Sequence, residues 1–340
     1  MKHLRWGSHV IVALLGSALA AGQSGYHLLN TYKLGGDGGW DYLTFDPEMH
    51  RLFIARSTRV MVIDADSGKS LGEIPDTPGV HGIALAPELG RGFASNGREG
   101  KVSIFDFKSL KLIAKIQAGD NPDAILYDPA TKRVFTFNGR SHDSTAIDAV
   151  KGEVVGTIKL DGKPEFAVSD ERGEIFVNLE DKSELQSIDA RKLEVKSRWP
   201  LTPCESPSGL AIDLKNRRLF SGCDNRLMAI VDADSGKLLT SLPIGDGVDA
   251  TKFDPEANLA FASCGDGTMT VIHEDSPGKF SVVQTITTQK GARTMAIDPK
   301  THHAFTVTAN FGPPPAPTPE QPRPRPTILP DSFVVLVLGK

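Results

Sequence analysis

The chain has 340 residues, of which 39% are hydrophobic and 24% are charged, and its formal net charge is -4. This composition is that of an ordinary globular protein. A nucleic-acid-binding protein needs a basic surface, so the weakly acidic balance argues against a nucleic-acid partner.

The first twenty residues have the features of a secretory signal peptide. Lys2 and Arg5 precede an apolar run over residues 10–19, and Ala18-Leu19-Ala20 is a small-residue cleavage pattern. We therefore predict that residues 1–20 are removed and that the protein is exported to the periplasm or the extracellular space. The alternative is an uncleaved N-terminal anchor. No later stretch is long and apolar enough to be predicted to span a membrane.

Residues 26–34 (YHLLNTYKL) are predicted to form an outer strand that has no sheet of its own in front of it. A partner is found at the far end of the chain, where residues 333–338 (FVVLVL) have the pattern of a final strand. We expect the two segments to pair in one sheet. This pairing would remove an open sheet edge, so the loss of either segment should destabilise the fold.

Between these two ends, one pattern occurs seven times: a short strand, a turn that often contains Asp-Pro, and a second strand with a phenylalanine. Successive phenylalanines are 40, 42, 41, 44, 41 and 44 residues apart: Phe53, Phe93, Phe135, Phe176, Phe220, Phe261 and Phe305. A third and an outer strand follow each pair. A period in the low forties built from short strands is typical of β-propeller blades. The predicted fold is all-β: a seven-bladed β-propeller over residues 21–340, with four antiparallel strands per blade.

A proline-rich segment interrupts the last blade. Residues 312–330 (GPPPAPTPEQPRPRPTILP) contain nine of the 23 prolines and cannot form a central strand. We expect an exposed loop of polyproline type between the second and third strands of that blade. The loop either docks a partner through its basic Pro-Arg-Pro spine or is an insert without a partner.

The three cysteines are Cys204, Cys223 and Cys264. An exported chain can oxidise one pair. Cys223 and Cys264 occupy equivalent places in adjacent repeats, which should be too far apart to bond. Cys204 enters the blade whose second strand ends at Cys223, so the predicted disulfide is Cys204–Cys223. There is no Cys-x-x-Cys-His motif, which excludes covalently attached c-type haem.

The second strands of the seven repeats read FIAR, FASN, FTFN, FVNL, FSGC, FASC and FTVT. They resemble the aromatic-Val-x-Asn segments of the YVTN-repeat, YncE-like propeller family, with Phe93 to Asn96 and Phe135 to Asn138 the best matches. The resemblance covers nearly all of residues 26–340. It implies a seven-bladed wheel, often exported in bacteria. It does not imply one particular function, because propellers carry many unrelated tasks.

Alignment of the repeats on phenylalanine places seven residues at equivalent entries to the innermost strands: Asp41, His81, Asp123, Glu165, Ser208, Asp249 and Arg293. In a propeller these entries surround one mouth of the central channel, where a ring of charges concentrates the electric field. We predict a ligand-binding mouth there. The alternative is that these residues only complete the strand ends and face water. A Ca²⁺ held by the four carboxylates is conceivable, but a single histidine does not make a zinc site.

The sequence contains no phosphate-loop or HExxH motif, and no catalytic residue or cofactor is predicted from motifs. The favoured function is a binding or scaffold module, a monomer that recognises a protein, peptide or small ligand at the channel mouth. The alternative is a lactonase-type hydrolase. In that case Glu165 and His81 would activate water and Arg293 would hold an anionic substrate. A redox role with a bound quinone or a separate cytochrome is a third, weaker option.

Overall fold

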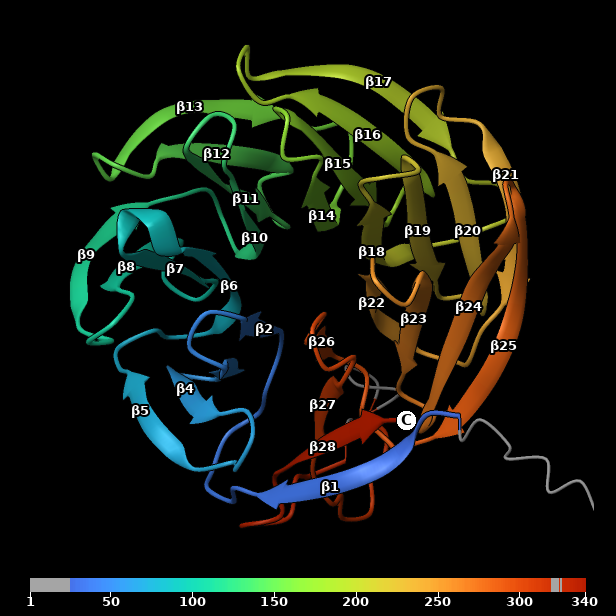
Figure 1. Cartoon of the computed structure of the whole chain (residues 1–340). Coiled ribbons are helices and arrows are strands. Elements are labelled where there is room, and N and C mark those ends of the chain that lie inside the picture. Colours follow the sequence, from blue (N-terminus) through green and yellow to red (C-terminus); the bar gives the residue numbers. More distant parts are fainter. Residues whose placement is uncertain (1–24, 319–323, 325) are drawn as a thin grey trace, which may run out of the picture.

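The structure is a computed structural model that describes residues 25–318, 324 and 326–340. The predicted signal peptide at residues 1–20 lies outside this range. In the described residues the chain forms seven four-stranded antiparallel sheets arranged in a ring around a common centre, as Figure 1 shows. The predicted seven-bladed all-β propeller is therefore confirmed.

Each blade runs from an innermost strand at the channel to an outermost strand at the rim. The first three blades are β2 (Leu43–Asp46), β3 (Arg51–Arg56), β4 (Arg59–Asp64) and β5 (Ser70–Ile74); β6 (Val80–Ala86), β7 (Arg91–Asn96), β8 (Lys101–Asp106) and β9 (Leu112–Gln117); and β10 (Pro122–Asp128), β11 (Arg133–Asn138), β12 (Asp143–Asp148) and β13 (Glu153–Lys159). A single turn of 3-10 helix, η1 (Pro87–Leu89), joins β6 to β7.

The next three blades are β14 (Pro164–Ser169), β15 (Glu174–Leu179), β16 (Glu184–Asp189) and β17 (Glu194–Pro200); β18 (Pro207–Asp213), β19 (Arg218–Cys223), β20 (Leu227–Asp232) and β21 (Leu238–Pro243); and β22 (Val248–Asp254), β23 (Leu259–Cys264), β24 (Thr268–Ser276) and β25 (Lys279–Thr287). The seventh blade is β26 (Met295–Ile297), β27 (Ala304–Thr308), β28 (Val334–Gly339) and β1 (His27–Lys33).

The seventh blade joins the two ends of the chain. β1 pairs antiparallel with β28, from His27 opposite Gly339 to Lys33 opposite Val334. The backbone amides of Leu34 and Gly35 then both donate to the carbonyl of Phe333 at 3.0 Å. Figure 1 shows this blue strand along the outer side of the red C-terminal strand. The predicted closure of the ring is confirmed.

The repeated phenylalanines lie in the core between blades. All seven are at most 2% exposed, and each belongs to a cluster of buried side chains. Phe135, for example, packs with Ile175 and Val177 of the next blade. Complete burial of one such side chain contributes about 1.5–3 kcal/mol. The periodic phenylalanine is thus a blade-to-blade contact and not a ligand stack.

The innermost strands share a local irregularity that the sequence did not predict. The pairing register shifts near the start of β6, β10, β14, β18 and β22, immediately after the first paired residue. A β-bulge of this kind bends the strand and redirects the side chain at the irregularity. The second residue of each of these strands is one of the seven mouth residues.

The predicted disulfide is present. Cys204 and Cys223 form a disulfide, with their Cα atoms 5.8 Å apart, while Cys264 is free and buried. Residues 312–330 leave the blade between β27 and β28, and the base of this segment is closed by a bridge between Phe311 and Ile328. In the part of the chain that the structure describes, no helix is long and apolar enough to cross a membrane.

Candidate binding site at the channel mouth

The seven predicted mouth residues occupy equivalent positions around the channel. Five of them are the second residue of an innermost strand: His81, Asp123, Glu165, Ser208 and Asp249. Asp41 and Arg293 come just before β2 and β26. The blades are tied together at this end, because the Tyr42 amide donates to the His81 carbonyl at 3.2 Å and the Ala250 amide to the Arg293 carbonyl at 3.1 Å.

On one side of the mouth, three residues meet. His81 Nδ1 lies 2.6 Å from Asp41 Oδ2, in a hydrogen bond, and 3.6 Å from Asp123 Oδ1. The three side chains come from three successive blades and each is between 18% and 26% exposed. A histidine between two carboxylates is held in its charged, doubly protonated form.

On the other side, Arg293 pairs with Asp249. Arg293 Nε lies 3.1 Å from Asp249 Oδ2, and the Ser208 hydroxyl donates to Asp249 Oδ1 at 3.5 Å. Glu165 has only a longer ion pair, 3.5 Å to Lys163 Nζ, and Lys163 forms a closer pair with Glu180. Glu165 and Asp123 are therefore the two mouth carboxylates that have no ion pair shorter than 3.5 Å.

Burial and mutual repulsion raise the pKa of the mouth carboxyl groups. Burial is the main cause at Asp123, whose pKa rises to about 6, and at Glu165, whose pKa rises to about 8 with a further contribution from the charge of Asp123. The pKa values of Asp41 and Asp249 are also raised by burial, although His81 and Arg293 respectively oppose the rise. Carboxyl groups that raise each other's pKa lie close together.

The nearby carboxylates also raise the pKa values of the two cationic groups, His81 and Arg293, and so favour their charged forms. Burial would lower the pKa of His81, but the hydrogen bond to Asp41 and the charges of Asp123, Asp41 and Glu165 outweigh it and raise that pKa to about 9. The charge of Asp249 raises the pKa of Arg293. Near pH 7 the mouth therefore holds two protonated cations, and Glu165 is mostly neutral.

The residues fit a metal ion poorly. Asp41, His81 and Asp123 could each direct one ligand atom to a common point, since these atoms lie within 4.8 Å of one another. However, the histidine nitrogen that faces both carboxylates already shares a proton with Asp41, and Asp249 is paired with Arg293. Ca²⁺ requires six to eight oxygen ligands. Two of the four carboxylates are thus already engaged by cations of the protein itself.

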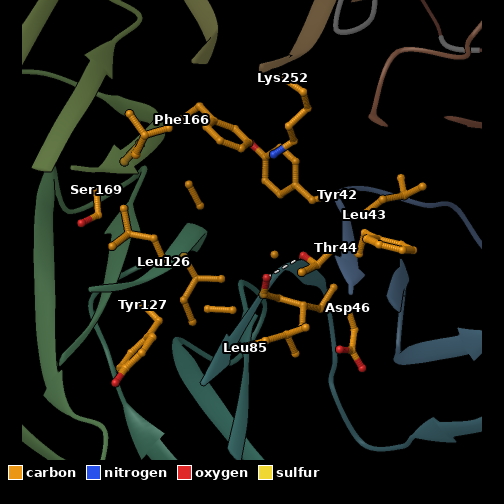
Figure 2. Close-up of a pocket in the computed structure, with 18 of the residues that line it drawn as sticks. Tyr42, Leu43, Thr44, Asp46, Leu85, Leu126, Tyr127, Phe166, Ser169 and Lys252 are labelled. Carbon is orange, nitrogen blue, oxygen red and sulfur yellow. Dashed lines mark hydrogen bonds between the residues drawn. The ribbon is translucent and has the colours of Figure 1, made fainter. Parts of the chain in front are cut away.

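Three residues beneath the mouth were not predicted from the sequence: Tyr42, Phe166 and Lys252. The Tyr42 and Phe166 rings meet edge to face, with centroids 5.2 Å apart, and Lys252 Nζ lies 4.8 Å from the Phe166 centroid. Figure 2 shows the three side chains converging from different directions. Burial, with the charges of Asp123, Glu165, Asp41 and Asp249, raises the pKa of Tyr42 well above its usual value.

Two hollows lie near the mouth. One of about 490 Å³ lies inside the channel, and Tyr42, Phe166 and Lys252 form part of its wall. The other, of about 890 Å³, lies beside the mouth, where Arg293 borders it together with Trp40, Phe311 and described prolines of the 312–330 segment. The acidic ring is thus continuous, through Arg293, with a hollow that has aromatic walls.

Comparison with known proteins supports the fold. No protein-family model matches the chain, and no curated protein matches it. Among solved structures, "Structure of U3-55K" superposes with a TM-score of 0.76 at 10% identity, covering 92% of this chain and 99% of that one. "Crystal structure of RRP9 WD40 repeats" gives the same TM-score and identity, covering 92% and 97%. Hydrazine synthase of Kuenenia stuttgartiensis gives 0.52 at 18% identity, covering 71% and 97%. At these identities, the similarity establishes the propeller fold alone.

Proposed function

We propose that this protein is an exported binding module of the YVTN-repeat propeller type, whose channel mouth receives a cationic group of a protein or peptide. The observation that carries the proposal is the convergence of four carboxyl groups from four blades on one partly buried ring. A closed ring of acids in a low-dielectric mouth attracts a positive group. The disulfide supports export, because such bonds persist in oxidising compartments.

The hollow beside the mouth supports a peptide as the ligand. Trp40 and Phe311 form part of its wall, with ring centroids 6.0 Å apart, next to Arg293 of the ring. An arginine or lysine side chain in the ring would leave a neighbouring apolar residue over this aromatic wall. Interfaces with one charged and one apolar anchor combine specificity with affinity. The preferred sequence is therefore a basic residue beside a large apolar residue.

Binding of a short labelled peptide tests the proposal. The probe is fluorescein-labelled Ala-Arg-Leu-Ala amide, compared with Ala-Gln-Leu-Ala amide at pH 8 by fluorescence anisotropy. We expect the arginine peptide to bind about tenfold more tightly, and we expect the double variant Asp123→Asn, Glu165→Gln to lose this preference. The matched control, Glu153→Gln with Glu194→Gln on exposed outer strands, should keep it.

Two results would overturn the proposal: equal binding of both peptides by the unmodified protein, or an unchanged preference in the mouth variant. Addition of CaCl₂ tests whether the ring binds a metal ion and not a peptide. Competition by millimolar Ca²⁺, but not by the same ionic strength of NaCl, would assign the ring to a metal ion in place of a peptide.

The hydrolase alternative gains no support from the site. A general base must be deprotonated at the working pH, but the pKa of Glu165 is about 8 and that of His81 about 9. Both groups are mainly protonated at pH 7. Hydrolysis of a sugar lactone by the unmodified protein, lost in His81→Ala and Glu165→Ala, would restore the hydrolase in place of the binding module.

A further inference from the structure

The channel contains a cavity below the mouth. The cavity of about 490 Å³ is surrounded mainly by β2, β6, β10 and β14, with Ile212 of β18 and Lys252 of β22 on the remaining side. Its volume falls in the range of small-molecule sites, about 300–1,000 Å³. The cavity wall includes none of the seven mouth residues, so the two sites are separate.

The wall is apolar, and its polar side chains are mostly engaged by the protein. The Thr44 hydroxyl donates to the Ile83 carbonyl at 2.7 Å, the Ser169 hydroxyl to Asp128 at 2.6 Å, and the Tyr127 hydroxyl to Glu88 at 2.5 Å. Figure 2 shows Leu85 and Leu126 between these groups. These three hydroxyl groups do not need a ligand to satisfy their donors.

Lys252 is the exception. It lies opposite the repeated phenylalanine in its blade, and the equivalent residues of the other six blades carry no charge: Thr44, Ala84, Leu126, Val168, Ala211 and Ala296. Among the described residues, no carboxylate or hydrogen-bond acceptor is placed against its ammonium group, and its contact is the face of Phe166. Burial lowers the pKa of Lys252 to about 8, which shows the cost of its uncompensated charge.

The acidic groups in the same cavity wall do not compensate Lys252. Asp46 accepts a hydrogen bond from Arg51 Nε at 2.9 Å and is fully buried with it. Glu171 is exposed, at the turn that follows β14. Figure 2 shows Asp46 well separated from Lys252 along the cavity. The cavity therefore combines an apolar wall with one positive group, Lys252.

We propose that this cavity binds a small organic carboxylate with an apolar body, whose carboxylate pairs with Lys252 Nζ while its hydrocarbon lies against the innermost strands. The Phe166 ring lies beside the pair and helps to exclude water. A charge-assisted hydrogen bond in such a site is worth more than one in water. A neutral or cationic molecule of the same shape lacks this interaction.

Calorimetric titration with octanoate tests the proposal, with octanol and octylammonium as probes of the same length. The unmodified protein should bind octanoate at least about tenfold more tightly than either of the other two. Lys252→Met, of similar length, should lose this preference, and Lys252→Arg should retain it. Lys237→Met, in the exposed turn between β20 and β21, is the matched control and should behave as the unmodified protein.

Chemical labelling gives a second readout that does not depend on the heat of binding measured by calorimetry. Octanoate should slow the acylation of Lys252 by an N-hydroxysuccinimide ester, followed by mass spectrometry, while Lys237 should react at an unchanged rate. The proposal is wrong if octanoate binds Lys252→Met as tightly as the unmodified protein, if octanol binds as well as octanoate, or if Lys252 is not protected. Each of these results is independent of peptide binding at the mouth, so the proposal for either site can be refuted without affecting the other.

Discussion

At the scale of single residues, Glu165 is a carboxyl group whose folded surroundings disfavour its charge. Its pKa of about 8 is raised from a usual value of 4.5, first by burial and then by the charge of Asp123. The folded state therefore binds this proton between pH 4.5 and 8, where the unfolded chain has already released it. Stability attributable to Glu165 accordingly falls as the pH rises through this window.

Glu165→Gln removes this penalty. We expect the variant to melt at nearly the same temperature as the unmodified protein at pH 4.5, and at an increasingly higher temperature as the pH approaches 8. Above pH 8 the difference should level off. Thermal unfolding followed by circular dichroism at closely spaced pH values measures it. A difference in melting temperature that is constant with pH, or largest in acid, would show that the fold does not disfavour the ionised form of Glu165.

Arg56 has a structural role at the same scale. It is fully buried, its Nη1 donates to the Gly38 carbonyl at 2.8 Å, and its Nη2 donates to the Gly36 and Asp37 carbonyls at 3.1 Å. Its guanidinium group also lies 3.8 Å from the Phe333 ring. One side chain thus fixes the connection from β1 to the first blade against the seventh blade.

Arg56→Met should destabilise the fold by about 2–4 kcal/mol, because several backbone carbonyls lose a charged donor from a fully buried side chain at once. Arg56→Lys should recover only part of the loss, since an ammonium group cannot replace the planar fork of donors. Denaturant unfolding of the three proteins gives the comparison. If lysine restored full stability, charge alone would explain the role of Arg56.

At the scale of elements, the sequence predicted the strands well, because each is short, apolar on alternate sides and bounded by turn residues. The repeated phenylalanines indicated the blade period. The two predicted strands without a sequence-adjacent partner, residues 26–34 and 333–338, indicated how the ring closes. The sequence also placed all seven mouth residues, since equivalent positions in a repeat reach equivalent places in space. The structure brings six of these side chains into contact across blade boundaries, while Glu165 pairs with Lys163.

What could not be predicted depends on contacts between blades that are distant in sequence. The bulges near the starts of β6, β10, β14, β18 and β22 are local to each blade and were also missed, although each of these strands begins with Pro or Val before its mouth residue. Tyr42, Phe166 and Lys252 belong to three different blades, and only the closed ring brings them together. The one available signal was a lysine at a position where the other repeats carry uncharged residues. The pKa values likewise follow from burial, which the sequence does not contain.

At the scale of the whole molecule, closure by β1 holds the wheel together. Without β1, the seventh blade has three strands and β28 presents an unpaired edge. A chain that begins at residue 35 should therefore unfold at a lower temperature and aggregate more readily than one that begins at residue 25. Size-exclusion chromatography and thermal unfolding of both chains measure this effect. Equal stability of the two chains would mean that the ring does not depend on this pairing.

The proposed function requires that the carboxyl groups of the mouth bind a cationic ligand. The most direct test is the affinity of the Ala-Arg-Leu-Ala probe between pH 5 and 9. Affinity should rise as Asp123 ionises near pH 6 and again as Glu165 ionises near pH 8, and the loss of charge from His81 near pH 9 acts in the same direction. Glu165→Gln should lack the step near pH 8. Affinity that is independent of pH, or highest in acid, would contradict the account.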